Sequence, residues 1–234
     1  MTSRTRPIHS RLLITAGPTR EPIDPVRYVS NYSTGTLGYT LARLARARGH
    51  RVTLISGPTE LPCPAGVLRI EVETAGQMHQ AVARTFPKAD ALIMGAAVAD
   101  FRPIRVASQK IKRSGAAGSM RLWHLELVEN ADIVAEAARQ RKPTQAVVGF
   151  ALETENLLIN ARRKLKAKDL DAIVATRFFK DQRGRGPFGA EPVDGAILDQ
   201  GGRAKPFRSL EKSVLAGRIL DTVEQILVRR RSIG

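Results

Sequence analysis

The chain has 234 residues, of which 43% are hydrophobic, and this is enough to bury the core of one large domain. No apolar run approaches the roughly 20 residues that a membrane-spanning helix needs, no secretory signal opens the chain, and the single cysteine, Cys63, excludes an internal disulfide, so we expect a cytoplasmic protein without membrane contact. The formal net charge of +16 attracts polyanions, but the charge is scattered and no nucleic-acid-binding motif accompanies it, which argues against nucleic acid as a partner.

Continuous apolar runs alternate with stretches of helical periodicity along the chain. Each run is short, as a buried strand is, and each helical stretch has its apolar residues on one face. In chain order the expected elements are a strand at 11–17, a helix at 36–48, strands at 51–57 and 67–72, a helix at 74–86, a strand at 89–97, a helix at 131–141, a strand at 145–151, a helix at 156–168 and a strand at 171–175. This alternation predicts an α/β fold with a Rossmann-like, doubly wound, mainly parallel sheet.

Other parts of the chain depart from this rhythm. We expect residues 1–10 to be a disordered tail and residues 11–234 to form a single domain. Within that domain, 102–120 is rich in Lys, Arg, Ser and Gly, which predicts a flexible flap, and 178–192 predicts a second long loop. The expected C-terminal elements are a hairpin of strands at 193–198 and 203–208 and a closing helix at 209–230.

Ligands of such sheets bind beyond the carboxyl ends of the strands, so function is expected in the loops that follow them. The loop after the first strand is long and lacks the glycine triplet of a dinucleotide site. It ends in Ser33-Thr34-Gly35 at the start of a helix, where free N–H groups and the helix dipole favour an anion, and where a plain Ser/Thr cap is the simpler interpretation. The loop also carries an unusual cluster of polar residues, namely Arg20, Glu21, Asp24, Arg27 and Asn31.

Three further groups are ambiguous from spacing alone. Asp100 follows the fourth strand, where it either contacts a ribose or base or caps a turn. The basic run Lys110–Arg113 either lies on a solvated surface or closes over a triphosphate. Lys164 and Lys168 share one helix face, and their spacing by itself favours a solvated face. No histidine has metal-ligand spacing, and no Walker A motif occurs.

Taken together and in order, these segments resemble one family of enzymes. The motifs Thr15–Arg27, Ser30–Gly35, Ala96–Asp100, Lys110–Arg113 and Val148–Phe150, the last followed by Glu153-Thr154, closely resemble those of the bacterial phosphopantothenate–cysteine ligases. The resemblance covers roughly residues 12–175, and the combination of separated motifs is far more specific than any one of them.

The resemblance implies a two-step reaction of coenzyme A biosynthesis. The carboxylate of 4'-phosphopantothenate attacks the α-phosphate of CTP, which gives an acyl-cytidylate and pyrophosphate. The amine of L-cysteine then attacks the acyl carbon, which gives 4'-phosphopantothenoylcysteine and CMP. The resemblance further implies CTP as co-substrate with ATP as the alternative, Mg²⁺ on the nucleotide phosphates, no FMN, a homodimer, and a stand-alone ligase whose decarboxylase is a separate chain.

The resemblance also implies roles for individual residues. Asn31 serves the second half-reaction, and Lys110 in the flap serves formation of the acyl-cytidylate, while Arg27 and Ala97 line the pantothenoyl side. The residues implied at the nucleotide are Asp100, Lys110, Asn130, Ala131, Asp132, Ile133, Phe150, Lys164 and Lys168. For the two helical lysines, this reverses the interpretation that spacing alone favours.

The sequence departs from the family pattern at four positions without losing an implied catalytic group: Ala131 replaces a proline, Leu152 an alanine, Thr36 a lysine and Thr176 an asparagine. Two rival functions follow from fold and charge. A Rossmann-type NAD(P) reductase would fit the fold, but the glycine fingerprint and a Tyr-x-x-x-Lys pair are missing from the sequence. A nucleic-acid binder driven by charge would show an affinity that collapses with salt.

Overall fold

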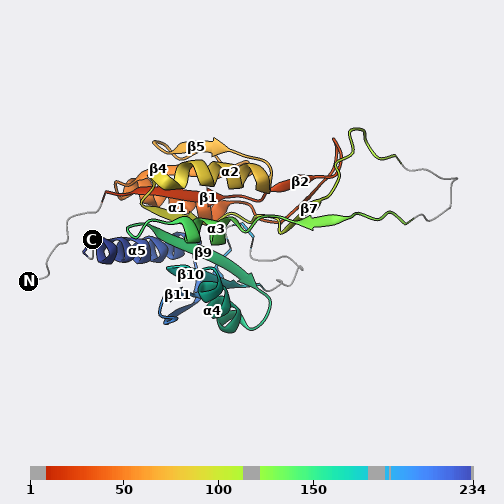
Figure 1. Ribbon diagram of the computed structural model, residues 1–234. Coiled ribbons are helices and arrows are strands. Elements are labelled where there is room, and N and C mark those ends of the chain that lie inside the picture. Colours follow the sequence, from red (N-terminus) through yellow and green to blue (C-terminus); the bar gives the residue numbers. More distant parts are fainter. Residues whose placement is uncertain (1–8, 113–121, 179–187, 190, 233–234) are drawn as a thin grey trace, which may run out of the picture.

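The computed structural model describes residues 9–112, 122–178, 188–189 and 191–232, and the expected tail at 1–8, the centre of the flap at 113–121 and most of the loop at 179–190 lie outside the described residues. The described chain forms a layered body from which a narrow arm projects (Figure 1). His9 and Ser10, which the sequence assigns to the tail, belong to the body: His9 Nδ1 lies 2.9 Å from the Gly49 carbonyl, and Ser10 is buried.

The body is built on a central sheet with eight described strands, mainly parallel, as the sequence predicts. From β10 to β5 along the sheet all neighbouring strands are parallel, whereas β11 and β12 add an antiparallel hairpin at one edge. In sheet order the strands are β12 (Ala204–Leu210), β11 (Val193–Asp199), β10 (Ala172–Arg177), β9 (Ala146–Glu153), β6 (Ala91–Met94), β1 (Arg11–Ala16), β4 (Arg51–Ser56) and β5 (Leu68–Glu71).

Helices cover both faces of this sheet, which explains why the strands are continuously apolar. In β1, Leu12 and Ile14 pack on the face that carries α1 and α5, and Leu13 packs on the opposite face. The first face carries α1 (Thr36–Ala47) and α5 (Lys212–Arg231), and the second carries α2 (Ala75–Thr85), α3 (Ile133–Gln140) and α4 (Leu157–Ala167), with a 3₁₀ turn at Phe86–Lys88 after α2.

Two pairs of short strands form the arm, and none of these four strands is among the elements predicted from the sequence. β2 (Arg20–Pro22) pairs with β3 (Tyr28–Ser30) inside the long first loop, and β7 (Phe101–Pro103) pairs with β8 (Leu127–Glu129) at the base of the flap. Strands of three residues are too short to show an alternating pattern, so these elements leave no periodic signal in the sequence. The flap is therefore anchored at its base by an antiparallel pair of strands. The prediction of a flexible flap that begins at residue 102 is wrong for Arg102 and Pro103, which belong to β7.

Two predicted boundaries are also wrong. The fourth strand ends at Met94, because the residues after it leave the sheet and bond to the first loop: the Ala97 N–H donates to the Gly17 carbonyl at 2.9 Å. The closing helix begins at Lys212 instead of Ser209, because Ser209 and Leu210 still belong to β12. Among the described residues, no helix is both long and apolar enough to cross a bilayer.

Candidate active site

A pocket of about 900 Å³ opens at the carboxyl edge of the sheet. It lies where β1 and β6 are neighbours but continue in opposite directions, β1 toward β4 and β6 toward β9. Such a switch point is where doubly wound sheets bind ligands. The pocket is lined by every sequence-predicted site residue except Arg27 and Lys110, that is, by Asn31, Ala97, Asp100, Asn130, Ala131, Asp132, Ile133, Phe150, Lys164 and Lys168.

One wall of the pocket is the segment Gly95–Asp100 that follows β6. Its backbone is tied to the first loop: the Ala99 N–H donates to Thr19 Oγ1 at 2.9 Å, and Ala97 forms a parallel bridge with Pro18. Small side chains along this segment allow a ligand to approach the backbone closely. This wall is therefore a fixed surface of main-chain groups.

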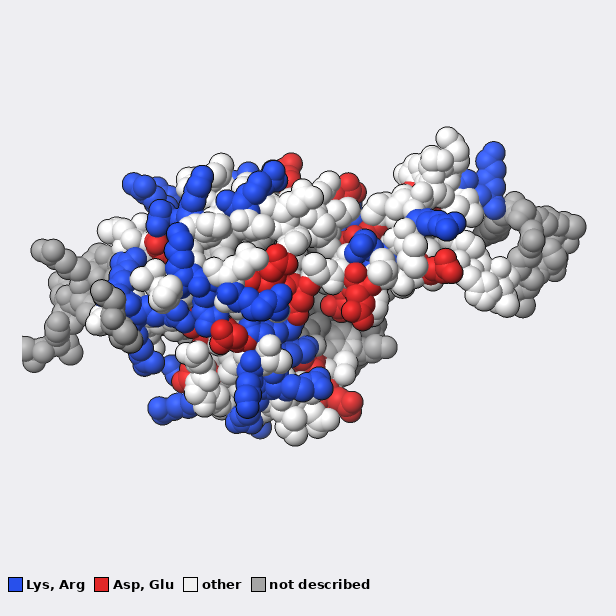
Figure 2. Space-filling view, in the orientation of Figure 1, with Lys and Arg blue, Asp and Glu red and all other residues white. Residues whose placement is uncertain are grey.

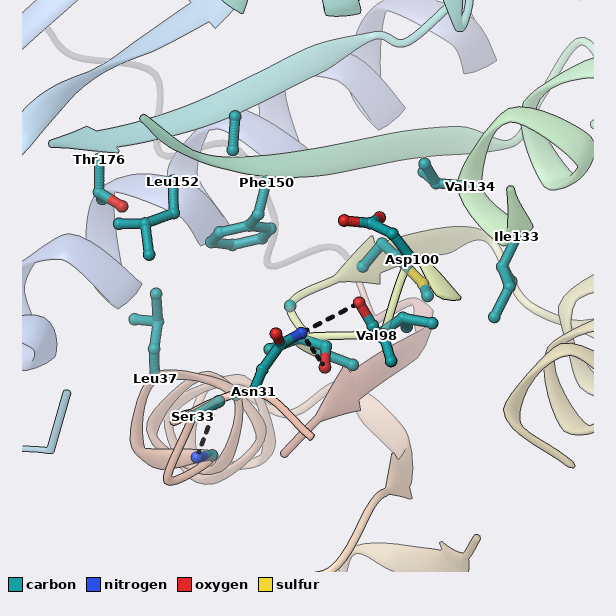
Figure 3. Close-up of a pocket in the computed structure, with 18 of the residues that line it drawn as sticks. Asn31, Ser33, Leu37, Val98, Asp100, Ile133, Val134, Phe150, Leu152 and Thr176 are labelled. Atoms are coloured by element: carbon teal, nitrogen blue, oxygen red, sulfur yellow. Dashed lines mark hydrogen bonds between the residues drawn. The ribbon is translucent and has the colours of Figure 1, made fainter. Parts of the chain in front are cut away.

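Asn31 reaches this wall from the end of β3. Its Nδ2 donates to the carbonyls of Ala97 at 3.1 Å and Val98 at 3.2 Å (Figure 3). Because a side-chain amide carries two N–H donors, both are used by the protein itself, and Oδ1 remains to accept a hydrogen bond from a ligand. The side chain is held in place in the pocket, and it presents an acceptor.

The first turn of α1 forms the opposite side of the pocket. Gly35 precedes the helix with a φ of 79°, a left-handed conformation that glycine adopts without strain, and no side chain caps this helix. The Ser/Thr cap considered from the sequence is therefore not formed here: the Ser33 Oγ accepts from the Gly35 N–H at 3.3 Å, one residue before the helix. Free N–H groups at the start of the helix favour an anion at this place.

The third side combines the turn before β7 with the start of α3. Asn130 Nδ2 donates to the Ala99 carbonyl at 2.8 Å, and its own N–H donates to the carbonyl of Asp100. Asn130 therefore shapes the turn, while the exposed carboxylate of Asp100 lines the pocket and remains accessible. Asp132 caps α3 by accepting from the Ala135 N–H at 3.1 Å.

Both predicted lysines, Lys164 in α4 and Lys168 directly after it, line the pocket, each with a carboxylate partner. Lys164 Nζ lies 2.7 Å from Glu153, whose side chain is 11% exposed, and Lys168 Nζ lies 2.9 Å from Asp132. Asn160 donates to the second oxygen of Glu153 at 2.9 Å, which fixes that carboxylate. These ion pairs hold the two ammonium groups at the pocket. On a fully solvated helix face, the other interpretation of their spacing, the two groups would have no such partners.

Aromatic rings lie over the pocket and at its rim. Phe150, half-buried on β9, turns its ring toward the cavity (Figure 3). Tyr32 and Phe188 lie with ring centroids 5.8 Å apart, and both line the pocket. The site thus offers an apolar surface for a ring, main-chain groups, carboxylates and lysines, which together suit a nucleotide.

Residues 8–227 match the family described as the DNA/pantothenate metabolism flavoprotein C-terminal domain. The chain belongs to this family. The coenzyme A biosynthesis bifunctional protein CoaBC of Vibrio vulnificus (strain CMCP6) is 41% identical over 219 residues, which are 92% of this chain and 52% of that protein. The CoaBC of Mycobacterium tuberculosis (strain ATCC 25618 / H37Rv) is 42% identical over 227 residues, which are 93% of this chain and 52% of that protein. The chain therefore spans about half the length of the curated relatives it matches.

Solved structures agree with this family. The crystal structure of the C-terminal domain of CoaBC has a TM-score of 0.77 and 33% sequence identity, and the match covers 96% of this chain and all of that domain. A Cab2 mutant in complex with phosphopantothenate-cysteine has a TM-score of 0.70 at 15% identity over 94% of this chain and 88% of that one, a likeness of fold. The predicted Rossmann-like α/β fold is the fold of the CoaBC C-terminal domain.

In this family member, the two predicted residues outside the pocket lie on the arm. Arg27 donates to Asp24 with Nε at 3.0 Å, donates to the Ile111 carbonyl at 2.9 Å, and stacks over Trp123 with 5.4 Å from its guanidinium carbon to the ring centroid. Lys110 is exposed, next to this contact. The hydrogen bonds from Arg27 hold the pKa of the buried Asp24 carboxyl well below its usual range.

The structure adds residues that the sequence did not indicate. Phe188, Gly189 and Lys212 line the pocket from the C-terminal part of the chain, where the family resemblance is weaker. Burial lowers the pKa of Lys212. The only signal for Lys212 in the sequence is its place near the start of a predicted helix, and a single lysine there gives no reason to suspect a site.

Metal binding by the protein alone is not supported in the part of the chain that is described, because no three His, Cys, Asp or Glu side chains gather there. Asp100, Glu129 and Asp132 are separate carboxylates of the pocket. Mg²⁺ commonly binds through one or two carboxylates together with substrate phosphates. The donor set therefore fits a Mg²⁺ ion that a nucleotide brings with it.

Proposed function

We propose that this protein is a ligase that joins 4'-phosphopantothenate to L-cysteine through an acyl-cytidylate, with CTP as the co-substrate. The observation that carries the proposal is the gathering of residues from separate segments, Asn31, Asp100, Asp132, Phe150 and Lys164, around one pocket at the switch point of the sheet. The CoaBC proteins of Vibrio vulnificus and Mycobacterium tuberculosis, which match over most of this chain, are bifunctional proteins of coenzyme A biosynthesis.

The first half-reaction activates the carboxylate of phosphopantothenate. A carboxylate oxygen attacks the α-phosphorus of CTP, and the bond to the pyrophosphate leaving group breaks. Negative charge accumulates on the phosphates, so it needs cations that are already in position. Lys164 in α4 and Lys168 directly after that helix supply two, and Lys110 supplies another from the arm. A Mg²⁺ ion near Asp100 and Asp132 would neutralise further charge on the phosphates.

In the second half-reaction the amine of cysteine attacks the acyl carbon, CMP leaves, and the amine loses a proton. Asn31 Oδ1 is the free acceptor of a fixed amide, whereas both N–H donors are used by the Ala97 and Val98 carbonyls. We propose that Oδ1 accepts a hydrogen bond from the cysteine amine and aims its lone pair at the acyl carbon. This gives Asn31, which the resemblance assigns to the second step, the role of a hydrogen-bond acceptor.

We further propose that two copies of the chain share each site. Arg27 and Lys110 do not line the pocket of the same chain, and the segments that carry them belong to the arm that projects from the body (Figure 1). On the face shown in Figure 2, uncharged side chains form stretches of the arm's described surface between its basic and acidic ones. Its exposed apolar side chains, among them Val26 at 58%, Ile104 at 55% and Val106 at 55%, favour contact with another protein surface. A second copy would cover this surface and supply Lys110 to the pocket.

The proposed activity is tested by pyrophosphate release in the presence of phosphopantothenate, cysteine and Mg²⁺, with CTP compared with ATP. We expect release with CTP that requires phosphopantothenate. Release only with ATP would keep the ligation and overturn the proposed nucleotide. No release with either nucleotide, from a protein that is folded by circular dichroism, would contradict the proposed function.

The role of Asn31 and the shared site are tested together. Asn31→Ala should still release pyrophosphate in a single turnover but should accumulate acyl-cytidylate without forming the amide. Mixing Asn31→Ala with Lys110→Ala should restore part of the activity, because a mixed dimer contains one site with an intact pocket and an intact partner arm. If mixing restores nothing although mixed dimers form, each site is built from a single chain.

A further inference from the structure

Glu153 is a buried carboxylate to which the proposed reaction gives no role. It is the last residue of β9, and its neighbour Leu152 lines the pocket although Glu153 itself does not. Acidic side chains are rarely buried unless they are paired, because the charged form loses its hydration. A buried acid beside a site that must bind phosphates is also unexpected, since its negative charge opposes theirs. Both costs indicate that the carboxylate has a function there.

The backbone and the side chain of Glu153 are both fixed by the protein. The backbone carbonyl accepts from the Phe178 N–H at 2.7 Å. One carboxylate oxygen accepts from Asn160 Nδ2 at 2.9 Å, and the other accepts from Lys164 Nζ at 2.7 Å. Asn160 and Lys164 are four residues apart in α4, so they lie on the same side of that helix. The carboxylate therefore connects the end of β9 to one side of α4.

This connection sets the direction of the Lys164 side chain. A lysine has a flexible four-carbon stem, and ordering such a stem when a ligand binds lowers the affinity. Within the described part of the chain, the bonded partner of the Lys164 ammonium is Glu153. An ammonium group has three N–H donors, so two of them are available to a ligand in the pocket that Lys164 lines.

The other lysine at this side of the pocket is held less firmly. Lys168 Nζ lies 2.9 Å from Asp132, but the Asp132 side chain is 46% exposed, against 11% for Glu153. An exposed ion pair is screened by water and orders its side chains weakly. A carboxylate that is buried and has a second hydrogen bond keeps one position. Of the two lysines, Lys164 is therefore the one whose ammonium group is oriented before a ligand binds.

We propose that Glu153 is a positioning residue, which holds the ammonium group of Lys164 at the place where the phosphates of the nucleotide bind. The inference rests on the proposed function, because that function supplies the nucleotide. Glu153 acts through Lys164 and does not contact the ligand. Positioning and repulsion have opposite signs, which makes the inference testable: loss of the positioning weakens nucleotide binding, whereas loss of the repulsion alone strengthens it.

The experiment is a double-mutant cycle. Calorimetric titrations with CTP, ATP and cytidine in the presence of Mg²⁺ are made on the full chain, on Glu153→Ala, on Lys164→Ala and on the double variant. Glu153→Gln keeps the size of the side chain and an oxygen for Lys164, and it decides the outcome if Glu153→Ala does not fold. Glu155→Gln is the matched control, because Glu155 is an exposed acid two residues away that does not line the pocket. Melting temperatures report whether each variant is folded.

We expect Glu153→Ala to weaken binding of the nucleotide by about 10-fold and Glu153→Gln by about 3-fold, and both to leave cytidine, which has no phosphate, unaffected. In the Lys164→Ala background, Glu153→Ala should change the affinity by less than about 2-fold, because the group through which it acts is absent. In the pyrophosphate assay, KM for the nucleotide should rise and KM for cysteine should stay constant. Glu155→Gln should bind as the unmodified chain does.

Unchanged or tighter nucleotide binding by the folded Glu153 variants would overturn the inference, because repulsion would then be the main effect of the carboxylate. Equal losses from Glu153→Ala with and without Lys164, or an equal loss with cytidine, would also overturn it and identify Glu153 as a structural residue of the pocket. If the unmodified chain binds neither nucleotide and releases no pyrophosphate, the proposed function fails, and the inference fails with it. If the unmodified chain does both, a negative result at Glu153 contradicts the inference alone.

Discussion

The pocket and the arm are built in opposite ways. Groups around the pocket are fixed by contacts within the body: Asn31 is held by backbone carbonyls, Asp132 caps a helix, and Lys164 pairs with Glu153. The arm consists of strands of three residues with exposed apolar side chains, and its reactive candidate, Lys110, is exposed. A fixed pocket can bind a nucleotide with little reorganisation, whereas an exposed arm is suited to add a group after binding.

The arm nevertheless contains a buried carboxylate whose contacts connect its two halves. Asp24 is 3% exposed, and its carboxylate accepts from the Val26 N–H at 2.8 Å and the Ile111 N–H at 3.1 Å as well as from Arg27. This contact joins the hairpin of the first loop to the irregular segment of the flap that carries Lys110. The two regions therefore differ in how firmly their residues are fixed: many contacts hold the pocket residues in place, and few hold the arm.

The largest effect is expected from the arm. Lys110→Ala should lower the turnover number by about 100- to 1000-fold, the loss typical of removing a group that stabilises charge in the transition state. The melting temperature should not change, because the side chain is exposed. Lys112→Ala is the matched control, since Lys112 is also exposed and lies two residues away. Equal losses in both variants would mean that the flap contributes only general positive charge.

A substitution in the body should lower both the stability of the fold and the affinity for the nucleotide, whereas Lys110→Ala on the arm should leave stability unchanged. A Cβ on Gly38 would lie 2.5 Å from the Cβ of Ala16 in β1, so Gly38→Ala should push α1 off the sheet and lower the free energy of unfolding by about 1–3 kcal/mol. Nucleotide affinity should fall with it. The matched control is Gly217→Ala in α5, where the new Cβ would meet Arg48 at an ordinary 3.6 Å. Because alanine favours a helix by up to about 1 kcal/mol, that variant should be neutral or more stable. Chemical denaturation measures both, and a destabilised Gly217→Ala would contradict this account.

The body and the arm also differ in how well their secondary structure could be predicted from the sequence. The body elements were predicted because long apolar runs and helical faces repeat with a clear period, and β1, α1 and β4 lie within one residue of their predicted bounds. β2 and β7 could not be predicted, because three residues show no period and their pairing depends on distant segments.

The site follows a similar division. Residues within the recognised motifs, such as Asp100 and Phe150, do line the pocket. The acceptor role of Asn31 could not be predicted, because it depends on the positions of the Ala97 and Val98 carbonyls. Lys212 could not be predicted either, since a single lysine near the start of a helix gives no signal of the pocket that it lines.

A smaller effect on stability is expected at Asp132, a residue of the body that makes two contacts. Asp132 caps α3 and pairs with Lys168, and the pair is well exposed, with 46% exposure of the Asp132 side chain. Asp132→Ala should lower the free energy of unfolding by about 1 kcal/mol, mainly through the lost cap. Asp132→Asn keeps a capping oxygen and loses only an exposed ion pair, so it should cost at most about half as much. If chemical denaturation shows equal losses, the ion pair and not the cap supports this side of the pocket.

The smallest effect on overall stability is expected at Asp24, where the change should be confined to the arm. Trp123 is the only tryptophan of the chain and stacks on Arg27, so its fluorescence reports on this contact. The pKa of Asp24 is lowered in the folded protein, so its contribution is fully present above the unfolded value of about 3.9 and is lost only as the pH falls through the lower folded value. Emission should therefore stay constant from neutral pH to about pH 4 and change below it. Asp24→Asn should show altered emission already at neutral pH, whereas Glu126→Gln, the same change of charge at an exposed position of the arm, should not. A transition in the unmodified chain well above pH 4 would show that the Asp24 carboxylate does not hold the flap segment at Ile111.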